Sequence, residues 1–479
     1  MTPTENGAVA APQPVAAPEP APALAPVSAA DRIQALDVVR GCALLGILLM
    51  NILTFGLPFA AYGNPTVAGG STGLNLAAWV TQFIVFDGKM RALFSLCFGA
   101  GVILLTMRGE KRGAGIDTAD VYYRRTLWLL LFGLLHAYFI WWGDILYPYA
   151  LCALVLFPLR KLSPRTLLIA AGVLVSLLTL ASLGQGRQMR ETRDKALKAQ
   201  AAEKAGQKLT KEQEDAKKNW EKALKEIQPP PEDVKKEIDD YRGGYLSALK
   251  RRAGLTFRWH SKPFYFPMMF DFYAMMLVGM AFMKMDVLSA GRSWRFFAWM
   301  AALGYLIGLP VNSLAAWQSV HANFEPLQVM ASFVTYHFGR VAVALAHLAV
   351  ILMVVKAGAL AWLTRRLAAV GQMAFSNYLS HSLICTLIFY GYGLGMIGKL
   401  QRYQLYGVVL LIWVFNLAWS PLWLRRFQFG PMEWCWRSLT YWKRQPMRIR
   451  QPALAAAAAV PAEASADQGA GGFGGQLVE

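Results

Sequence analysis

The sequence predicts an all-α, polytopic integral membrane protein of about ten transmembrane helices, with one long charged helical loop outside the membrane. Of 479 residues, 56% are hydrophobic and 16% are charged, against roughly 25% charged in an ordinary soluble domain. Residues 186–263 alone hold 20 of the 48 Lys and Arg and 13 of the 29 Asp and Glu. The remainder is so apolar that lipid is the solvent it requires. The net charge of +19 therefore does not indicate a nucleic-acid partner.

Ten runs of mostly apolar residues are long enough to cross a bilayer as helices. They are 36–57, 90–107, 126–142, 145–160, 166–183, 265–283, 296–316, 331–355, 371–391 and 405–424. The stretch 74–86 is too short to cross and is expected at the interface or against the second span. The predicted organisation is an Ala/Pro-rich disordered tail (1–31), an N-terminal membrane half (32–183), a charged helical loop (184–263), a C-terminal membrane half (264–445) and a second disordered tail (446–479).

Basic residues in the short loops orient these spans. Lys and Arg are frequent in 108–125, 160–165, 284–295 and 425–450, whereas 58–73 and 317–330 contain none. Because basic short loops stay in the cytoplasm, we expect both termini on the cytoplasmic side of a bacterial inner membrane. The charged loop then lies outside, where its length removes it from that rule.

Two interpretations of the charged loop remain open. A capping box at Thr210 and Gln213 and the prolines from Pro229 onward indicate a solvent-exposed helix within 187–227. This helix is either a solvated spacer or an arm that binds a partner.

Ionisable residues are costly within a span and therefore mark candidate functional positions. Asp37 and Arg40 are three residues apart in the first span and are expected to pair. Arg40 serves either that ion pair or an anionic substrate. Asn51 lies about 21 Å further along the helix, at a depth matching His136 in the third span. Asp144 follows at the next turn, where its carboxylate can orient the imidazole.

Other polar residues lie on three further spans. Lys89 and Arg91, at the mouth of the second span, either recognise an anion or extend to the lipid headgroups. The eighth span carries a polar stripe of His337, Arg340 and His347, for which Asp271 is the candidate counter-charge. The ninth span carries a polar patch of Ser376, Asn377, Tyr378 and His381.

Several catalytic signals are absent from the sequence: a P-loop, a dinucleotide fingerprint, His or Cys pairs with metal-ligand spacing, and a Gly-x-Ser-x-Gly elbow. We therefore predict no metal, and no ATP or serine nucleophile is indicated. The remaining His, Asn, Asp and Arg residues suit proton abstraction and oxyanion stabilisation.

The motifs resemble the YeiB-like family of bacterial inner-membrane proteins, which contains the domain of unknown function 418. The resemblance covers about 32–183 and 260–445. It rests on Leu-Asp-x-x-Arg-Gly at 36–41, Asp-Gly-Lys-x-Arg at 87–91, Phe-Gly-Leu-Leu-His at 132–136, Gly-Asp-Ile-Leu at 143–146 and Phe-Gly-Pro-Met-Glu-Trp at 429–434.

A more distant similarity links that family to transmembrane acyltransferases such as heparan-alpha-glucosaminide N-acetyltransferase. Only Asp37, Arg40, Gly41 and Asn51 match those enzymes, which transfer acetyl from cytoplasmic acetyl-CoA to a sugar. A His follows soon after the Asn in those enzymes. Here the next His after Asn51 is His136, which we take as the substitute base.

The resemblance implies an acyltransferase that moves a short acyl group from cytoplasmic acyl-CoA to an envelope acceptor, expected to be a glycan. His136 would take the acceptor's proton, Asp144 would assist, Asn51 would steady the thioester oxygen, and Arg40 would attract the CoA phosphates. A transporter or exporter using the stripe that contains His337 and Arg340 is the first alternative. A non-catalytic scaffold working through the charged loop is the second. The oligomeric state stays open.

Overall fold

The computed structural model describes residues 32–111, 113, 115–261 and 265–449. These residues form helices connected by short turns, together with one isolated β-bridge. The helices are α1 (Gln34–Gly56), η1 (Phe59–Tyr62), α2 (Gly73–Thr81), η2 (Gln82–Phe86), α3 (Lys89–Lys111), α4 (Asp117–Phe139), α5 (Leu146–Leu159), α6 (Pro164–Lys204), α7 (Lys211–Ile227), α8 (Pro231–Arg242), α9 (Tyr245–Ser261), α10 (Tyr265–Lys284), α11 (Trp294–His321), α12 (Pro326–Lys356), α13 (Ala361–Gln372), α14 (Ala374–Phe389), α15 (Arg402–Leu424) and α16 (Pro431–Thr440).

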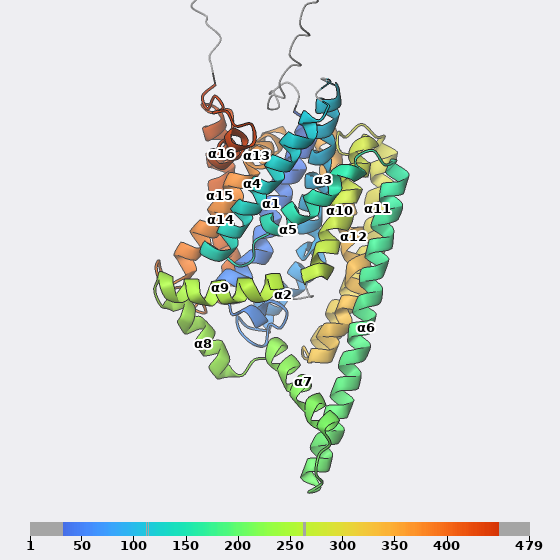
Figure 1. Ribbon diagram of the computed structural model, residues 1–479, viewed down its shortest axis with the longest axis vertical. Coiled ribbons are helices and arrows are strands. Elements are labelled where there is room, and N and C mark those ends of the chain that lie inside the picture. The colour runs from blue at the N-terminus through green and yellow to red at the C-terminus, as the bar shows by residue number, and fades with distance from the viewer. Residues whose placement is uncertain (1–31, 112, 114, 262–264, 450–479) are drawn as a thin grey trace, which may run out of the picture.

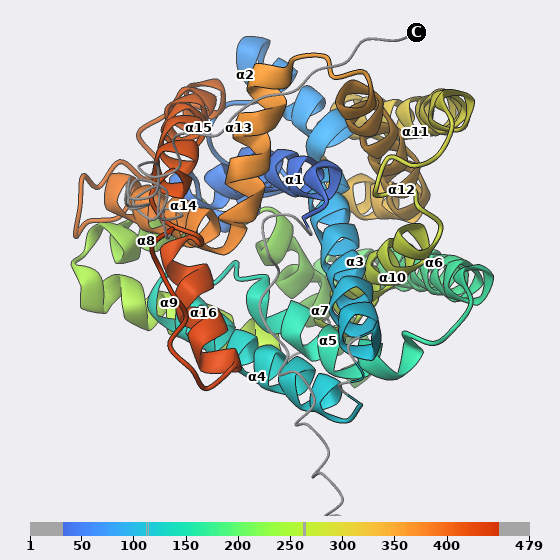
Figure 2. The same cartoon turned by 90° about the horizontal axis from the view of Figure 1, so that it is seen from above.

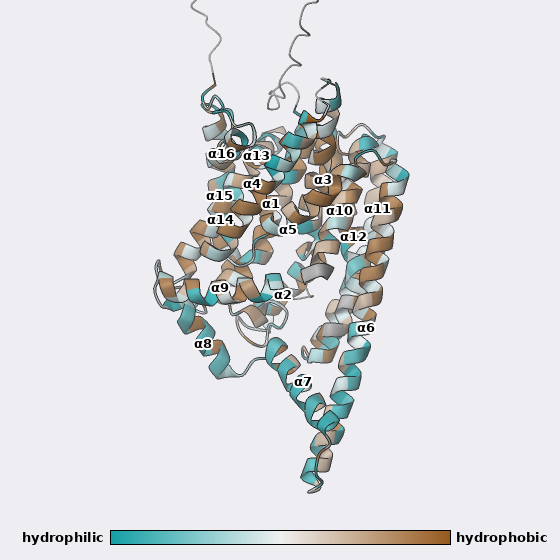
Figure 3. Ribbon diagram, in the orientation of Figure 1, coloured by the Kyte–Doolittle hydropathy of each residue, from teal (hydrophilic) through white to brown (hydrophobic). Residues whose placement is uncertain are grey.

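The prediction of an all-helical membrane protein is confirmed at the level of six candidate spans. Six helices are long and apolar enough to cross a bilayer, and they lie at 34–56, 73–111, 164–204, 294–321, 334–356 and 402–424. Helices α5 and α14 are apolar but shorter. Figure 3 shows hydrophobic residues throughout the bundle and hydrophilic ones on α7, α8 and the lower part of α6.

Helix α1 lies in the middle of the bundle (Figure 2) and packs against α3, α13, α14 and α15. Nearly all of its residues are buried; those left partly open include Arg40, Asn51 and Thr54. At about 100° per residue these three positions share one face of the helix. Leu44 and Ile47 lie between them on the same face and are closed to solvent.

The short basic loops gather at one end of the bundle. The basic loops after α3, α5 and α10 lie at the end that carries α16, and α7–α9 lie at the other (Figure 1). Contacts between loops join the first end: Arg160 pairs with Glu110, and the Lys284 ammonium donates to the Leu162 carbonyl at 2.6 Å. The distribution of basic loops predicted from the sequence is therefore present in the fold.

The charged loop is more structured than a single exposed helix. Helix α6 continues out of the bundle to Lys204, and α7 folds back along it. The predicted capping box of Thr210 and Gln213 is confirmed at the start of α7. Ion pairs Lys195–Glu212 and Lys217–Glu203 join the two helices, and the Ala-rich face of α6 is buried between them. The loop is therefore a helical hairpin followed by α8 and α9.

The predicted tails fall largely on residues 1–31 and 450–479, which lie outside the described residues. The ordered chain runs four residues into the second predicted tail. The Gln428 backbone N–H donates to the Met447 carbonyl at 2.9 Å, and the Ile449 backbone N–H donates to the Arg426 carbonyl at 3.1 Å. These bonds hold the segment after α16 against the end of α15.

Candidate active site

The structure joins Asp144, His136 and Ser382 into one buried chain of hydrogen bonds. His136 Nδ1 lies 2.8 Å from Asp144 Oδ1, and His136 Nε2 lies 2.9 Å from Ser382 Oγ. The three residues are 5%, 1% and 1% exposed. The predicted pairing of Asp144 with His136 is thus confirmed, and Ser382 of α14 completes the chain.

The chemistry of these groups assigns the protons. An ionised carboxylate can only accept hydrogen bonds, which places the proton of a neutral imidazole on Nδ1 and leaves Nε2 as the acceptor. Ser382 Oγ–H therefore donates to His136 Nε2. A carboxylate, an imidazole and a hydroxyl in this order are the arrangement that activates an oxygen nucleophile.

The short segment between α4 and α5 sets this geometry. His136 lies in the last turn of α4, and Asp144 lies two residues before α5 begins. Asp144 Oδ2 also accepts the Tyr147 backbone N–H at 2.7 Å, which places the carboxylate at the positive end of the α5 dipole. The Ile145 N–H donates to the Tyr378 hydroxyl at 3.2 Å. The first bond fixes the turn at the start of α5, and the second holds it beside α14.

Helix α9 caps the end of α4 just beyond His136. Arg252 donates to the carbonyls of Tyr138, Phe139 and Ile140 at 3.1, 2.8 and 3.0 Å. Thr256 Oγ1 donates to the Ala137 carbonyl at 3.0 Å. The last carbonyls of a helix have no hydrogen-bond donor within that helix, and here α9 of the charged loop supplies the donors. This part of the loop is therefore a structural component of the site, unlike a solvated spacer.

Asn51 is related to the site through a series of aromatic contacts that begins one helical turn away. It is one turn before Phe55 on α1, and the Phe55 ring stacks on Trp141 with centroids 4.4 Å apart. The Trp141 ring centroid is in turn 6.4 Å from that of His136. No hydrogen bond joins Asn51 to His136 or Asp144 in the described chain. The indole N–H of Trp141 is buried and has no partner among the described residues.

Asp37 and Arg40 form the predicted pair at the other end of α1, with Arg40 Nη1 2.8 Å from Asp37 Oδ1. The motif Leu-Asp-x-x-Arg-Gly at 36–41 ends in Gly41, and a glycine is required there because α1 and α13 approach closely at this position. A Cβ on Gly41 would lie 2.1 Å from the Leu367 carbonyl oxygen, and one on Gly371 would lie 1.9 Å from that of Asp37. The Arg40 side chain is 26% exposed, so the pair leaves it accessible.

A second buried polar cluster surrounds Asp271. Its carboxylate pairs with Arg91 at 3.1 Å and with Arg340, which is fully buried. Lys89 is also fully buried, and its ammonium donates to the Phe83 carbonyl at 2.7 Å. The headgroup-directed alternative for Lys89 is therefore wrong. Asp271 is the counter-charge that the sequence indicated for Arg340.

The predicted stripe on α12 does not converge on one place. His337 Nε2 lies 3.3 Å from Ser182 Oγ on α6, whereas His347 bonds to Tyr305 and to the Val85 carbonyl. Together with Arg340, which pairs with Asp271, these residues contact four separate neighbours. Their polarity is used mainly in helix packing.

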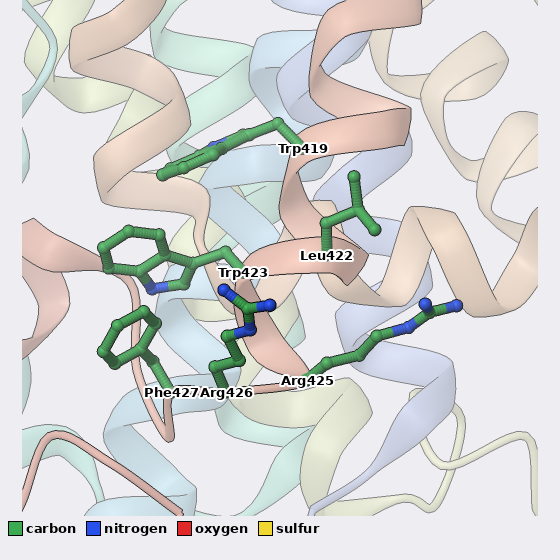
Figure 4. Close-up of a pocket in the computed structure, with 6 residues that line it drawn as sticks. All are labelled: Trp419, Leu422, Trp423, Arg425, Arg426 and Phe427. Carbon is green, nitrogen blue, oxygen red and sulfur yellow. The ribbon is translucent and has the colours of Figure 1, made fainter.

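A surface hollow of about 460 Å³ lies at the end of α15, as Figure 4 shows. Its lining residues are Trp419, Leu422, Trp423, Arg425, Arg426 and Phe427. None of the predicted site residues lines this hollow.

Sequence reasoning missed Ser382, although His381 beside it was part of the ninth-span patch. His381 bonds to the Asn416 side chain at 2.6 Å, so the two neighbours serve different partners. A serine within a span ordinarily bonds the backbone of its own helix. A serine with a functional role therefore cannot be distinguished from the others by sequence. Arg252 and Thr256 were missed because they lie in a charged segment whose docking the sequence does not reveal.

Comparison with known proteins finds uncharacterised relatives. The family model described as a protein of unknown function (DUF418) matches residues 282–443. The uncharacterized protein YxaH of Bacillus subtilis is 31% identical over 431 residues, covering 86% of this chain and 95% of that protein. The uncharacterized protein YeiB of Escherichia coli is also 31% identical over 431 residues, covering 85% and 95%. No solved structure matches the chain.

Proposed function

The chain belongs to the YeiB-like DUF418 family, and from its own geometry we propose that it is a membrane-embedded acyltransferase. The observation that carries the proposal is the buried Asp144–His136–Ser382 chain. An imidazole whose Nδ1 is held by a carboxylate presents Nε2 to a hydroxyl, and this is the arrangement that removes a proton during acyl transfer. Burial excludes water, which favours transfer over hydrolysis.

In this proposal a short acyl group moves from cytoplasmic acyl-CoA to an envelope acceptor, a glycan hydroxyl or amine. His136 is the base, and Asp144 fixes its tautomer and stabilises the imidazolium. Asn51, on the face of α1 near Trp141, would steady the thioester oxygen. Arg40, accessible at the basic end of α1, would attract the CoA phosphates.

We propose in addition that the chain crosses a bacterial inner membrane ten times. Each of the ten apolar runs overlaps a helix of the bundle. The basic loops lie at the end carrying α16, opposite α7–α9 (Figure 1). By the positive-inside rule this end faces the cytoplasm. His136, near the opposite end of α4, would then lie close to the acceptor side.

The test uses the purified full chain in nanodiscs with labelled acetyl-CoA and an extract of envelope glycans. His136→Gln should reduce CoA release and label transfer by about 10²–10⁴-fold, the usual contribution of a general base. His321→Ala is the matched control, because His321 is exposed on α11 and bonds to the Trp317 carbonyl of its own helix. Equal transfer by wild type and His136→Gln, or no binding of acyl-CoA, would refute the proposal.

The Asp271 cluster favours transport as the second candidate, because charges buried among membrane helices commonly mark a translocation path. This function predicts a substrate flux that survives His136→Gln but is lost in Asp271→Asn. Measuring flux in proteoliposomes that hold equal amounts of folded protein of each variant separates the two functions.

A further inference from the structure

We propose that Ser382 carries the acyl group covalently between donor and acceptor. The inference rests on the proposed acyltransferase function and adds the identity of an intermediate. The Ser382 hydroxyl bonds to another helix: Oγ lies 2.9 Å from His136 Nε2 of α4. On α14 itself, Ser380 and Thr386 instead donate to the carbonyls of Asn377 and Leu383.

The surroundings of Ser382 meet the requirements of a nucleophile. His136 accepts its proton, and Asp144 holds the other imidazole nitrogen at 2.8 Å. Trp141 offers a buried N–H that has no partner among the described residues, with its ring beside His136. A developing oxyanion requires such a donor. A base and an orienting carboxylate therefore serve one hydroxyl, and the ring that carries the candidate oxyanion donor lies 6.4 Å from the base.

The depth of the site within the bundle favours a relay, in which Ser382 holds the acyl group after the donor leaves and before the acceptor binds. His136 lies 19 residues after the start of α4, which places it about 28 Å from that end of the helix. The donor and the acceptor of the proposed reaction approach from opposite ends of the bundle. A covalent carrier allows each of them to bind in turn, without both being present in one buried site.

The proposed transfer takes place in two steps. Ser382 Oγ attacks the thioester carbon; the C–O bond forms, the C–S bond breaks, and the proton passes through His136 Nε2 to the CoA thiolate. The acceptor oxygen or nitrogen then attacks the acyl carbon of the seryl ester; its bond to that carbon forms, and the bond between that carbon and Ser382 Oγ breaks. The acceptor's proton passes through Nε2 to Ser382 Oγ, which regenerates the hydroxyl. The net reaction converts acyl-CoA and acceptor into CoA thiol and acylated acceptor.

Two measurements on the full chain in nanodiscs test the relay, the first with labelled CoA and the second with acetyl-CoA labelled in its acetyl group. The first is exchange of labelled CoA into acetyl-CoA without acceptor, which a covalent intermediate permits. The second is mass spectrometry of the peptide that contains Ser382. Wild type and the matched control Ser380→Ala should exchange CoA and carry one acetyl group. Ser382→Ala should lose the label and reduce transfer about a hundredfold or more.

Ser382→Cys provides a signature that a purely structural hydroxyl cannot produce. Its acetyl group would be a thioester, released by neutral hydroxylamine, whereas the wild-type oxygen ester would resist it. Transfer by Ser382→Ala at the wild-type rate, without exchange in wild type, would overturn the relay and leave the acyltransferase intact. Absence of both exchange and transfer from wild type would overturn both proposals.

Discussion

Removing the Arg252 side chain should detach α9 from the end of α4. Arg252 is fully buried and donates to the carbonyls of Tyr138, Phe139 and Ile140. In Arg252→Ala, Phe139 keeps the Tyr245 hydroxyl as a donor at 2.9 Å. The carbonyls of Tyr138 and Ile140 lose the hydrogen bonds that Arg252 donates to them. At about 1–3 kcal/mol for each buried acceptor left unsatisfied, the loss of stability is about 2–6 kcal/mol.

The assay is thermal unfolding of the purified protein in detergent, followed by the fluorescence of its 16 tryptophans. Arg251→Ala is the matched control. Arg251 is 35% exposed and pairs with Glu237 at 3.3 Å and Asp240 at 3.7 Å, and such surface pairs contribute about 0–1 kcal/mol. Arg252→Lys should recover part of the loss, because an ammonium can reach fewer of the carbonyls at once. Equal melting temperatures for Arg252→Ala and Arg251→Ala would refute the capping role.

Three further results are expected. Asp271→Asn should destabilise the protein by about 3–5 kcal/mol, because it leaves the buried Arg340 without its counter-charge; the double change Asp271→Leu with Arg340→Met should melt higher than Asp271→Asn alone. Burial lowers the pKa of His260 in α9 below its usual 6.5, so folding stability should fall as pH drops from about 6.5 through that lowered pKa. The melting temperature of His260→Gln should change less with pH over this range than that of wild type. Asp144→Asn should reduce acetyl transfer by about 10²–10⁴-fold with little change in melting temperature, since it disturbs the tautomer of His136; unchanged transfer would exclude Asp144 from the reaction.

Much of the candidate site could be predicted from residues that are close together in the sequence. The Asp37–Arg40 pair lies within one helical turn, and spacing alone predicts it. Asp144 follows His136 by eight residues across a tight turn, so their contact is also nearly local. The capping box at Thr210 is likewise a short-range feature. Each of these was confirmed because few backbone angles separate the partners.

Contacts between distant segments could not be predicted in this way. Ser382 lies 246 residues after His136, and Arg252 lies more than a hundred residues after the carbonyls it caps. Hydropathy identifies such segments as helical but does not specify which helix faces which, because lipid and helix interiors are equally apolar. The orientation of His381 and Ser382 toward different partners depends on the packing of α14 between α4 and α15.

The sequence by itself determined that this chain is a helical membrane protein of the YeiB-like family, with few ionisable residues in its spans and a charged loop between two halves. Apolar run length and charge distribution are local properties, and the bilayer imposes helices on them. The tertiary structure alone decided that Ser382 meets His136 and that α9 closes the end of α4. Those contacts depend on how the helices pack, so a serine and a charged helix that look ordinary in sequence form part of the candidate site.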